Sequence, residues 1–234
     1  MIPAEIEYDG KKMTIWVYGY IDIHGDKRPD FISTCIRGSG QFLEKKLLTY
    51  WKDKFGSIEN YVDLGANIGN HCVFAREVLG AKNLYAFEPY PSNYALLQKN
   101  CPGDTTYGVA LGDSEKRIGM GMSSAGEITN AATNEIIPCY NMGSLVVTAG
   151  DAVQQMTLDS YNIPQIDLMK IDVENYEVEA ITGALETLKR TTPVIYIEHN
   201  SVESLSKTYA LLKPLGYKIT NIIDEGNPNF EYSV

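Results

Sequence analysis

The chain has 234 residues, 44% hydrophobic and 21% charged, enough to bury the core of one globular α/β domain. Its net charge of −10 argues against a nucleic-acid substrate, because proteins that grip a phosphate backbone usually carry a basic stripe. No apolar run reaches the length of about 18 residues that predicts a membrane span, and the scattered cysteines indicate reduced thiols in a cytoplasmic protein.

Residues 1–36 are predicted to form a β-rich N-terminal lead-in, with a strand over 13–18 that is rich in β-branched and aromatic residues. We expect this lead-in to cover a sheet edge or to line the mouth of a substrate site. Residues 37–234 are predicted to form a single α/β domain. Its first helix is expected over 41–55, where apolar side chains recur at helical spacing.

A nucleotide-binding pattern follows this helix. Residues 61–64 predict a buried strand, 65–69 a glycine-containing turn, 70–79 a helix and 83–87 a second strand that ends at Glu88. A strand, a glycine turn, a helix and a second strand with a terminal acid are typical of the first half of a nucleotide-binding βαβ unit.

The details of the turn narrow the ligand. Its glycines do not have the G-x-G-x-x-G spacing of a dinucleotide site, and no Lys-Ser/Thr pair follows them as in a P-loop. Glu88 stands about twenty residues past the turn, where an acid accepts hydrogen bonds from ribose hydroxyls. Gly65 would let the backbone approach the ligand, and Asp63 could anchor the turn or bind the ligand's ammonium. A nucleoside without a diphosphate fits this pattern, and we predict S-adenosylmethionine as the cofactor.

The remaining elements continue the α/β order around one interruption. Residues 114–155 break the alternation and predict a β insertion beside the site, where substrate choice is often determined. The other predicted elements are a helix over 91–100, strands over 105–111, 166–171 and 194–197, helices over 176–188 and 200–215, and a closing hairpin of 217–223 with 229–232.

Three stretches resemble the FkbM family of S-adenosylmethionine-dependent methyltransferases. They are 62–69 (VDLGANIG), 86–89 (AFEP) and 168–177 (LMKIDVENYE), although Asn175 stands where the family usually has glycine. The resemblance, over about residues 40–200, implies a Rossmann-like class I methyltransferase fold. This is a mostly parallel seven-stranded sheet with helices on both faces and one antiparallel strand near the edge.

Acidic or polar residues end several predicted strands, and ligands of open α/β sheets bind outside these ends. We assign the cofactor to the turn, to the end of the second strand and to the end of the third. The predicted cofactor contacts are Asp63, Gly65, Asn67, Gly69, Asn70, Glu88, Pro89 and Ala110.

An alcohol acceptor needs a base to take its proton. The predicted candidates are Asp172, Glu174 and His199. Together with Glu198 they could instead hold a divalent cation, which we do not expect to be obligatory. The leading prediction is an O-methyltransferase for a hydroxyl of a sugar or small metabolite. A nucleotide-dependent oxidoreductase and a non-catalytic cofactor-binding protein remain as alternatives.

Overall fold

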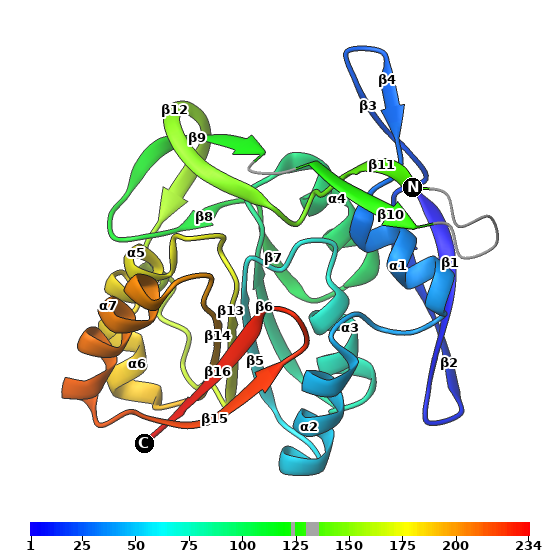
Figure 1. Cartoon of the computed structure of the whole chain (residues 1–234). Helices are drawn as coiled ribbons and strands as arrows, with labels where there is room; N and C mark the ends of the chain where they lie inside the picture. Colours follow the sequence, from blue (N-terminus) through cyan, green and yellow to red (C-terminus); the bar gives the residue numbers. More distant parts are fainter. Residues whose placement is uncertain (123–124, 130–135) are drawn as a thin grey trace.

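The computed structural model describes residues 1–122, 125–129 and 136–234 (Figure 1). Residues 123–124 and 130–135, which belong to the predicted insertion, lie outside this description. At the centre is a seven-stranded sheet. Its strands are, in spatial order, β15 (Lys218–Asp224), β16 (Pro228–Ser233), β14 (Val194–Glu198), β13 (Leu168–Ile171), β5 (Asn60–Leu64), β6 (Asn83–Phe87) and β7 (Thr105–Tyr107).

The strand directions confirm the predicted sheet. Strands β14, β13, β5, β6 and β7 are parallel, whereas β16 runs antiparallel to both of its neighbours, one position from the edge. The chain starts in the middle of the sheet at β5, runs outward to β7 and then returns to β13 beside β5. The order therefore reverses between β5 and β13, and ligands of such sheets bind at the carboxyl ends of these strands.

Helices cover both faces of the sheet, as predicted (Figure 1). One face carries α2 (Lys45–Phe55), α3 (Asn70–Glu77) and α4 (Pro91–Asn100), and the other carries α5 (Glu177–Thr182), α6 (Leu185–Thr191) and α7 (Val202–Leu212). Two short 3₁₀ turns lie at Leu158–Tyr161 and Lys213–Leu215. Within the described part of the chain, no helix is both long and apolar enough to cross a membrane.

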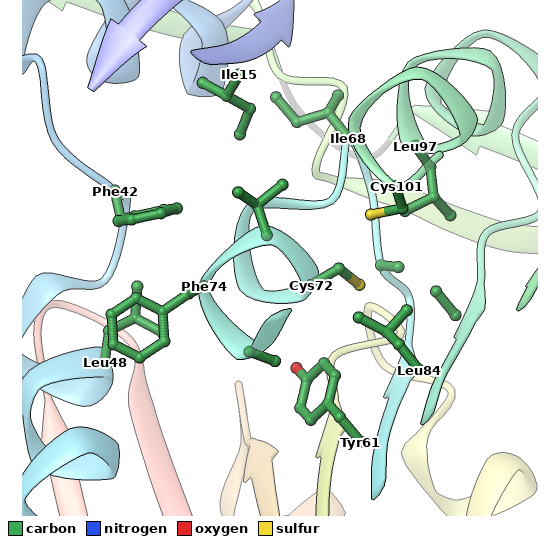
Figure 2. Packing of buried hydrophobic residues seen from close by; sticks show 14 of the residues in the cluster. Ile15, Phe42, Leu48, Tyr61, Ile68, Cys72, Phe74, Leu84, Leu97 and Cys101 are labelled. Carbon is green, nitrogen blue, oxygen red and sulfur yellow. The ribbon is translucent and has the colours of Figure 1, made fainter. Parts of the chain in front are cut away.

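Two hydrophobic clusters fill the space on either side of the sheet. Side chains alternate along each strand, so Tyr61 of β5 packs on the α2/α3 side and Val62 packs on the opposite side. On the α2/α3 side, the ring of Phe42 lies edge-on to Phe74, with centroids 5.4 Å apart (Figure 2). The same alternation places Lys170 of β13 on this side of the sheet, where it becomes important for the site.

The N-terminal segment packs on helices rather than on a sheet edge. It consists of β1 (Ile2–Tyr8), β2 (Lys11–Val17), β3 (Ile21–Ile23), β4 (Asp26–Arg28) and α1 (Phe31–Ser39). The side chain of Asn100 in α4 accepts from the Trp16 N–H at 2.6 Å and donates to its carbonyl at 2.8 Å, which joins the β1–β2 hairpin to α4. Helix α1 was not predicted, although Asp30 provides a standard cap by accepting from the Ser33 N–H at 2.8 Å.

The described part of the insertion is β structure, as predicted. It contains β9 (Lys116–Met122), β10 (Ala125–Thr129), β11 (Ile136–Tyr140) and the long β12 (Leu145–Met156). Strand β12 pairs antiparallel with β9 and parallel with β8 (Ala110–Leu111), and β10 pairs antiparallel with β11. The predicted single strand over 105–111 is therefore wrong, because its first half joins the central sheet as β7 and its second half joins the insertion as β8.

Two predicted helices differ most in their bounds. Helix α2 begins at Lys45 rather than at residue 41, because Glu44 adopts a left-handed backbone with φ 53°. The predicted helix over 176–188 is broken into α5 and α6 at Gly183. A Cβ at Gly183 would lie 1.9 Å from the carbonyl oxygen of Gly112, so the backbones of the two segments are in direct contact there.

Because of this contact, the addition of a single methyl group at Gly183 should destabilise the protein strongly. Gly183→Ala should lower the free energy of unfolding by about 1–3 kcal/mol, because the Cβ must displace backbone rather than a movable side chain. The measurement is the midpoint of urea unfolding. Gly38→Ala in α1 is the matched control, because its Cβ would meet nothing within 4 Å. It should stabilise the protein by about 0.5–1 kcal/mol. Equal effects of the two variants would contradict the contact.

Candidate active site

A cavity of about 520 Å³ opens at the carboxyl ends of β5, β6, β13 and β14, where the strand order reverses. Its volume lies in the range of about 300–1,000 Å³ that is usual for small-molecule sites. Segments outside the central sheet complete its wall: helix α1, the insertion and the loop between β15 and β16 all contribute residues. The insertion thus lies beside this cavity.

The glycines of the turn after β5 serve chain packing. Gly65 lines the cavity and has φ 83°, and a Cβ there would lie 1.8 Å from the Asp172 carbonyl oxygen. The end of the neighbouring strand thus requires a glycine here, whether or not a ligand approaches. Gly69 does not line the cavity. Its Cβ would lie 3.1 Å from Leu97, so it permits the close packing of α3 on α4.

Asp63 lies beneath the turn and not in the cavity wall. Its side chain is 1% exposed, and its Oδ2 accepts from the Tyr61 hydroxyl at 3.1 Å and from the Cys72 thiol at 3.2 Å. Burial raises the pKa of this carboxyl. The prediction that Asp63 contacts the cofactor is corrected, because strand alternation turns its side chain toward α3. It anchors β5 to that helix.

Glu88 joins the turn to the cavity. It is 5% exposed and lines the cavity, where its Oε2 accepts from the Asn67 N–H and its Oε1 from the Tyr90 N–H, both at 2.9 Å. Burial raises its pKa to about 7, against the opposing effect of these backbone donors. One carboxylate therefore fixes the turn and also presents acceptor oxygens to a ligand.

A loop of the insertion is fastened over this half of the cavity. The Met142 carbonyl accepts from the side-chain amides of Asn93 at 2.9 Å and Asn67 at 3.2 Å, and the Met142 N–H donates to Asp30 at 3.0 Å. Sequence reasoning missed Asn93, Met142 and Asp30. The available signal was Asn93, one of two asparagines on the inward side of α4.

The same half has an apolar wall, which includes the predicted Ala110. The wall residues come from the segment around β8 and from the insertion: Val109, Ala110, Leu111, Met120, Leu145 and Val147. Two further predicted cofactor residues, Pro89 and Asn70, also line the cavity. The Asn70 amide is engaged by both backbone groups of Leu43, at 2.9 and 3.2 Å, and so holds the segment before α2 in place.

The other half of the cavity is acidic. Asp172 and Glu174, after β13, and Glu198, at the end of β14, all line it. Burial, followed by the charges of Asp172 and Glu198, raises the pKa of Glu174 to about 8. Burial and Asp172 likewise raise the pKa of Glu198 to about 7, although Lys170 opposes this. The structure thus brings Asp172 and Glu174 together at the cavity.

A buried lysine, Lys170, lies next to the carboxylates of this acidic half. Lys170 is fully buried, and its Nζ lies 3.3 Å from Asp172 Oδ2. Burial disfavours its charge, but Asp172, Glu44, Glu198 and Asp63 together raise its pKa above the ordinary value. Sequence reasoning assigned no role to Lys170, although a lysine inside the apolar strand pattern of 166–171 was a visible signal.

Glu44 is a second cavity residue that the sequence did not reveal. Burial opposes its ionisation, but Lys170 and His71 hold the pKa of its carboxyl well below the ordinary value. His71 Nε2 lies 2.8 Å from Glu44 Oε2, and the Asn229 amide donates to Oε1 at 2.7 Å. The carboxylates of Asp172 and Glu44 therefore both have a cation nearby.

His199 faces away from the cavity. It is 4% exposed, its Nδ1 lies 3.0 Å from the Ser204 hydroxyl, and its Nε2 lies 2.9 Å from the Tyr232 hydroxyl. Burial lowers its pKa to about 4. The prediction of His199 as a base is therefore corrected, since both ring nitrogens are engaged between α7 and β16. The predicted alternative metal set of Asp172, Glu174, Glu198 and His199 is not assembled, and the described residues contain no group of three side chains arranged to hold a metal.

The strand order, the turn after β5 and the acid at the end of β6 define the class I methyltransferase fold. The chain belongs to the FkbM methyltransferase family, since the model of the Methyltransferase FkbM domain matches residues 63–219.

Two relatives are informative. The hexuronic acid methyltransferase AglP of Haloferax volcanii is 29% identical over 156 residues, which cover 64% of this chain and 59% of that protein. The crystal structure of methyltransferase FkbM from Methylobacillus flagellatus superposes with a TM-score of 0.51 at 19% identity, over 74% of this chain and 43% of the other. The chain therefore spans about half the length of these relatives.

The raised pKa of Glu198 predicts a pH-dependent effect of its removal. The folded protein holds this proton more tightly than the unfolded chain, so its contribution to stability is lost as pH rises from about 4.5 to about 7. Glutamine does not titrate, so the unfolding free energy of Glu198→Gln relative to wild type should rise across this window and then level off. Urea unfolding at a series of pH values measures the difference.

Glu203→Gln is the control for that series. Glu203 is exposed and its pKa is lowered by Lys207, so the relative stability of this variant should change slightly in the opposite direction as pH rises. A flat difference curve for Glu198→Gln would contradict the assignment of a raised pKa to Glu198.

Proposed function

We propose that the chain is an S-adenosylmethionine-dependent O-methyltransferase that acts on a hydroxyl of a sugar or small metabolite. The observation that carries this proposal is a single cavity with two chemically different halves. One half has Glu88 and an apolar wall, and the other has Asp172 held beside a buried lysine. Family membership supports methyl transfer, and the name of the AglP relative supports a sugar acceptor.

The residues of the first half fit the cofactor. The Glu88 carboxylate can accept hydrogen bonds from ribose hydroxyls, and Ala110 and its apolar neighbours offer a surface for the adenine. Gly65, Asn67, Asn70 and Pro89 complete the wall there. When bound, S-adenosylmethionine supplies a methyl group on a positively charged sulfur.

The residues of the second half would prepare the acceptor. Asp172 would accept the proton of a hydroxyl, and Lys170, whose Nζ lies 3.3 Å from its Oδ2, would fix the position of its carboxylate. Glu174 lies beside it as the second candidate for this role. The Met142 loop and the apolar wall would exclude water from the other half, which favours a reaction in which charge disappears. None of these roles requires a metal.

The first prediction of this function concerns the cofactor. S-Adenosylmethionine and S-adenosylhomocysteine should bind in calorimetry, and NAD should not. Glu88→Ala should weaken cofactor binding by roughly 1.5–3 kcal/mol, because it removes acceptors that a carboxylate provides. The exposed Glu203→Ala is the control and should bind like wild type. Preferential binding of NAD would instead support the oxidoreductase alternative.

The second prediction concerns proton removal. Asp172→Asn keeps the shape of the side chain but loses its charge, so single-turnover methyl transfer should slow at least about 100-fold while cofactor affinity changes much less. Asp167→Asn is the matched control. Asp167 precedes the same strand at its opposite end, where it accepts from the Glu59 and Asn60 N–H groups. It should leave turnover unchanged.

Three outcomes would change the assignment of Asp172. Equal losses of turnover and cofactor affinity would show that Asp172 binds the cofactor. Glu174 would then be the candidate for the base that takes the proton. Loss of wild-type turnover in a chelator, restored by Mg²⁺, would replace the base with a metal ion. Cofactor binding without any turnover would favour the non-catalytic alternative.

A further inference from the structure

The cavity wall has a one-sided charge. Six carboxylates line it, and among the lining residues that the structure describes there is no lysine or arginine. Five of the six belong to the acceptor half, around the ends of β13 and β14: Glu44, Asp172, Glu174, Glu198 and Glu225. This half of the cavity therefore favours a positively charged ligand over a negatively charged one.

Two of these five carboxylates have a cation beside them, and a third, Glu225, is exposed to solvent. Lys170 lies beside Asp172, and His71 and Lys170 act on Glu44. Glu225 accepts from the Leu47 N–H at the start of α2, at 2.8 Å. Contacts within the chain or with solvent therefore stabilise these three carboxylates, and none of them needs a ligand as a partner.

Glu174 and Glu198 differ from the other three. Glu198 is only 7% exposed, and its Oε1 accepts from the Asn227 amide at 2.7 Å. In the described ranges 1–122, 125–129 and 136–234, its Oε2 accepts no hydrogen bond and Glu174 makes none with its carboxyl. Glu174 and Glu198 both line the cavity, after the ends of the adjacent strands β13 and β14.

Within the described part of the chain neither of these two carboxylates has a cation at ion-pair distance, and although Lys170 acts on both, they repel each other. Partly or fully buried carboxylates without a paired cation are unfavourable. A positively charged group of a ligand would relieve both costs at once. An anionic ligand would add a further negative charge and would meet no lysine or arginine in the described wall. Like charges placed together in such a site cost several kcal/mol and exclude the wrong partner.

We propose that the acceptor carries an amino group close to the hydroxyl that is methylated, as in an amino sugar, and that Glu174 and Glu198 bind this ammonium. The proposal rests on the proposed function, since it concerns the acceptor of the same reaction. It narrows the substrate class from sugars in general to hydroxyl compounds with a positive charge, and it excludes uronic acids.

The test compares three sugars that differ in charge. Methyl transfer from S-adenosylmethionine is measured with glucosamine, glucose and glucuronate, and binding of each sugar to the protein saturated with S-adenosylhomocysteine is measured by calorimetry. Glucosamine should exceed glucose in kcat/KM by at least roughly tenfold, as expected for one ion pair in a partly buried site. Glucuronate should be the poorest of the three in both measurements.

Substitutions of Glu174 and Glu198 test whether these two carboxylates cause the preference for glucosamine. The double variant Glu174→Gln with Glu198→Gln should bring the ratio of glucosamine to glucose toward one, while the affinity for S-adenosylhomocysteine stays close to that of wild type. Glu203→Gln, on the exposed side of α7, should keep the ratio.

The results that would contradict the proposed function differ from those that would contradict the amine inference alone. No binding of S-adenosylmethionine would remove the proposed function itself. With the cofactor bound, equal or better use of glucose or glucuronate would overturn the amine inference alone, and so would the absence of both glucosamine transfer and glucosamine binding. Loss of S-adenosylhomocysteine affinity in the double variant would also overturn it, because the two carboxylates would then bind the ammonium of the cofactor.

Discussion

The acidic half of the cavity depends on the buried ammonium of Lys170. This side chain lies between the sheet and helices α2 and α3, where Asp63 is its neighbour in the adjacent strand. It is 3.3 Å from Asp172 and also acts on Glu44 from the other side. Removing one member of a buried ion set typically costs about 3–5 kcal/mol, because the remaining charges stay buried without compensation. With Lys170 present, several carboxylates can share one small space.

A second constraint is the direct contact of backbones at two glycines. At Gly65 the turn after β5 touches the end of β13, and at Gly183 the break between α5 and α6 touches Gly112 near the insertion. The first contact places the turn after β5, which lines the half of the cavity with Glu88, directly against Asp172. The second fixes the start of the insertion against the helices. The two halves of the cavity therefore have a rigid spacing, as a transfer between two bound molecules requires.

Several parts of the cavity wall come from outside the central βαβ framework. The Met142 loop connects the insertion to α4 through Asn93 and to the N-terminal segment through Asp30. Such peripheral segments can vary while the sheet keeps its order, so they are a suitable place for differences in substrate choice within a family. Asp172, Glu174 and Glu198 of the acidic half, by contrast, stand at the strand ends themselves.

The sequence alone determined the class of fold, the turn after β5, Glu88 and the acids after β13. Their signals are local: strand β6 and helix α4 have the predicted bounds, because a short apolar run and a proline at the first helical position are read within a few residues. The tertiary structure decided which polar residues reach the cavity. Asp63 and His199 both stand at strand ends, yet packing turns them toward α3 and α7. Side chains alternate with a period of two, so one residue of register separates the site from the core, and only the packed sheet fixes that register.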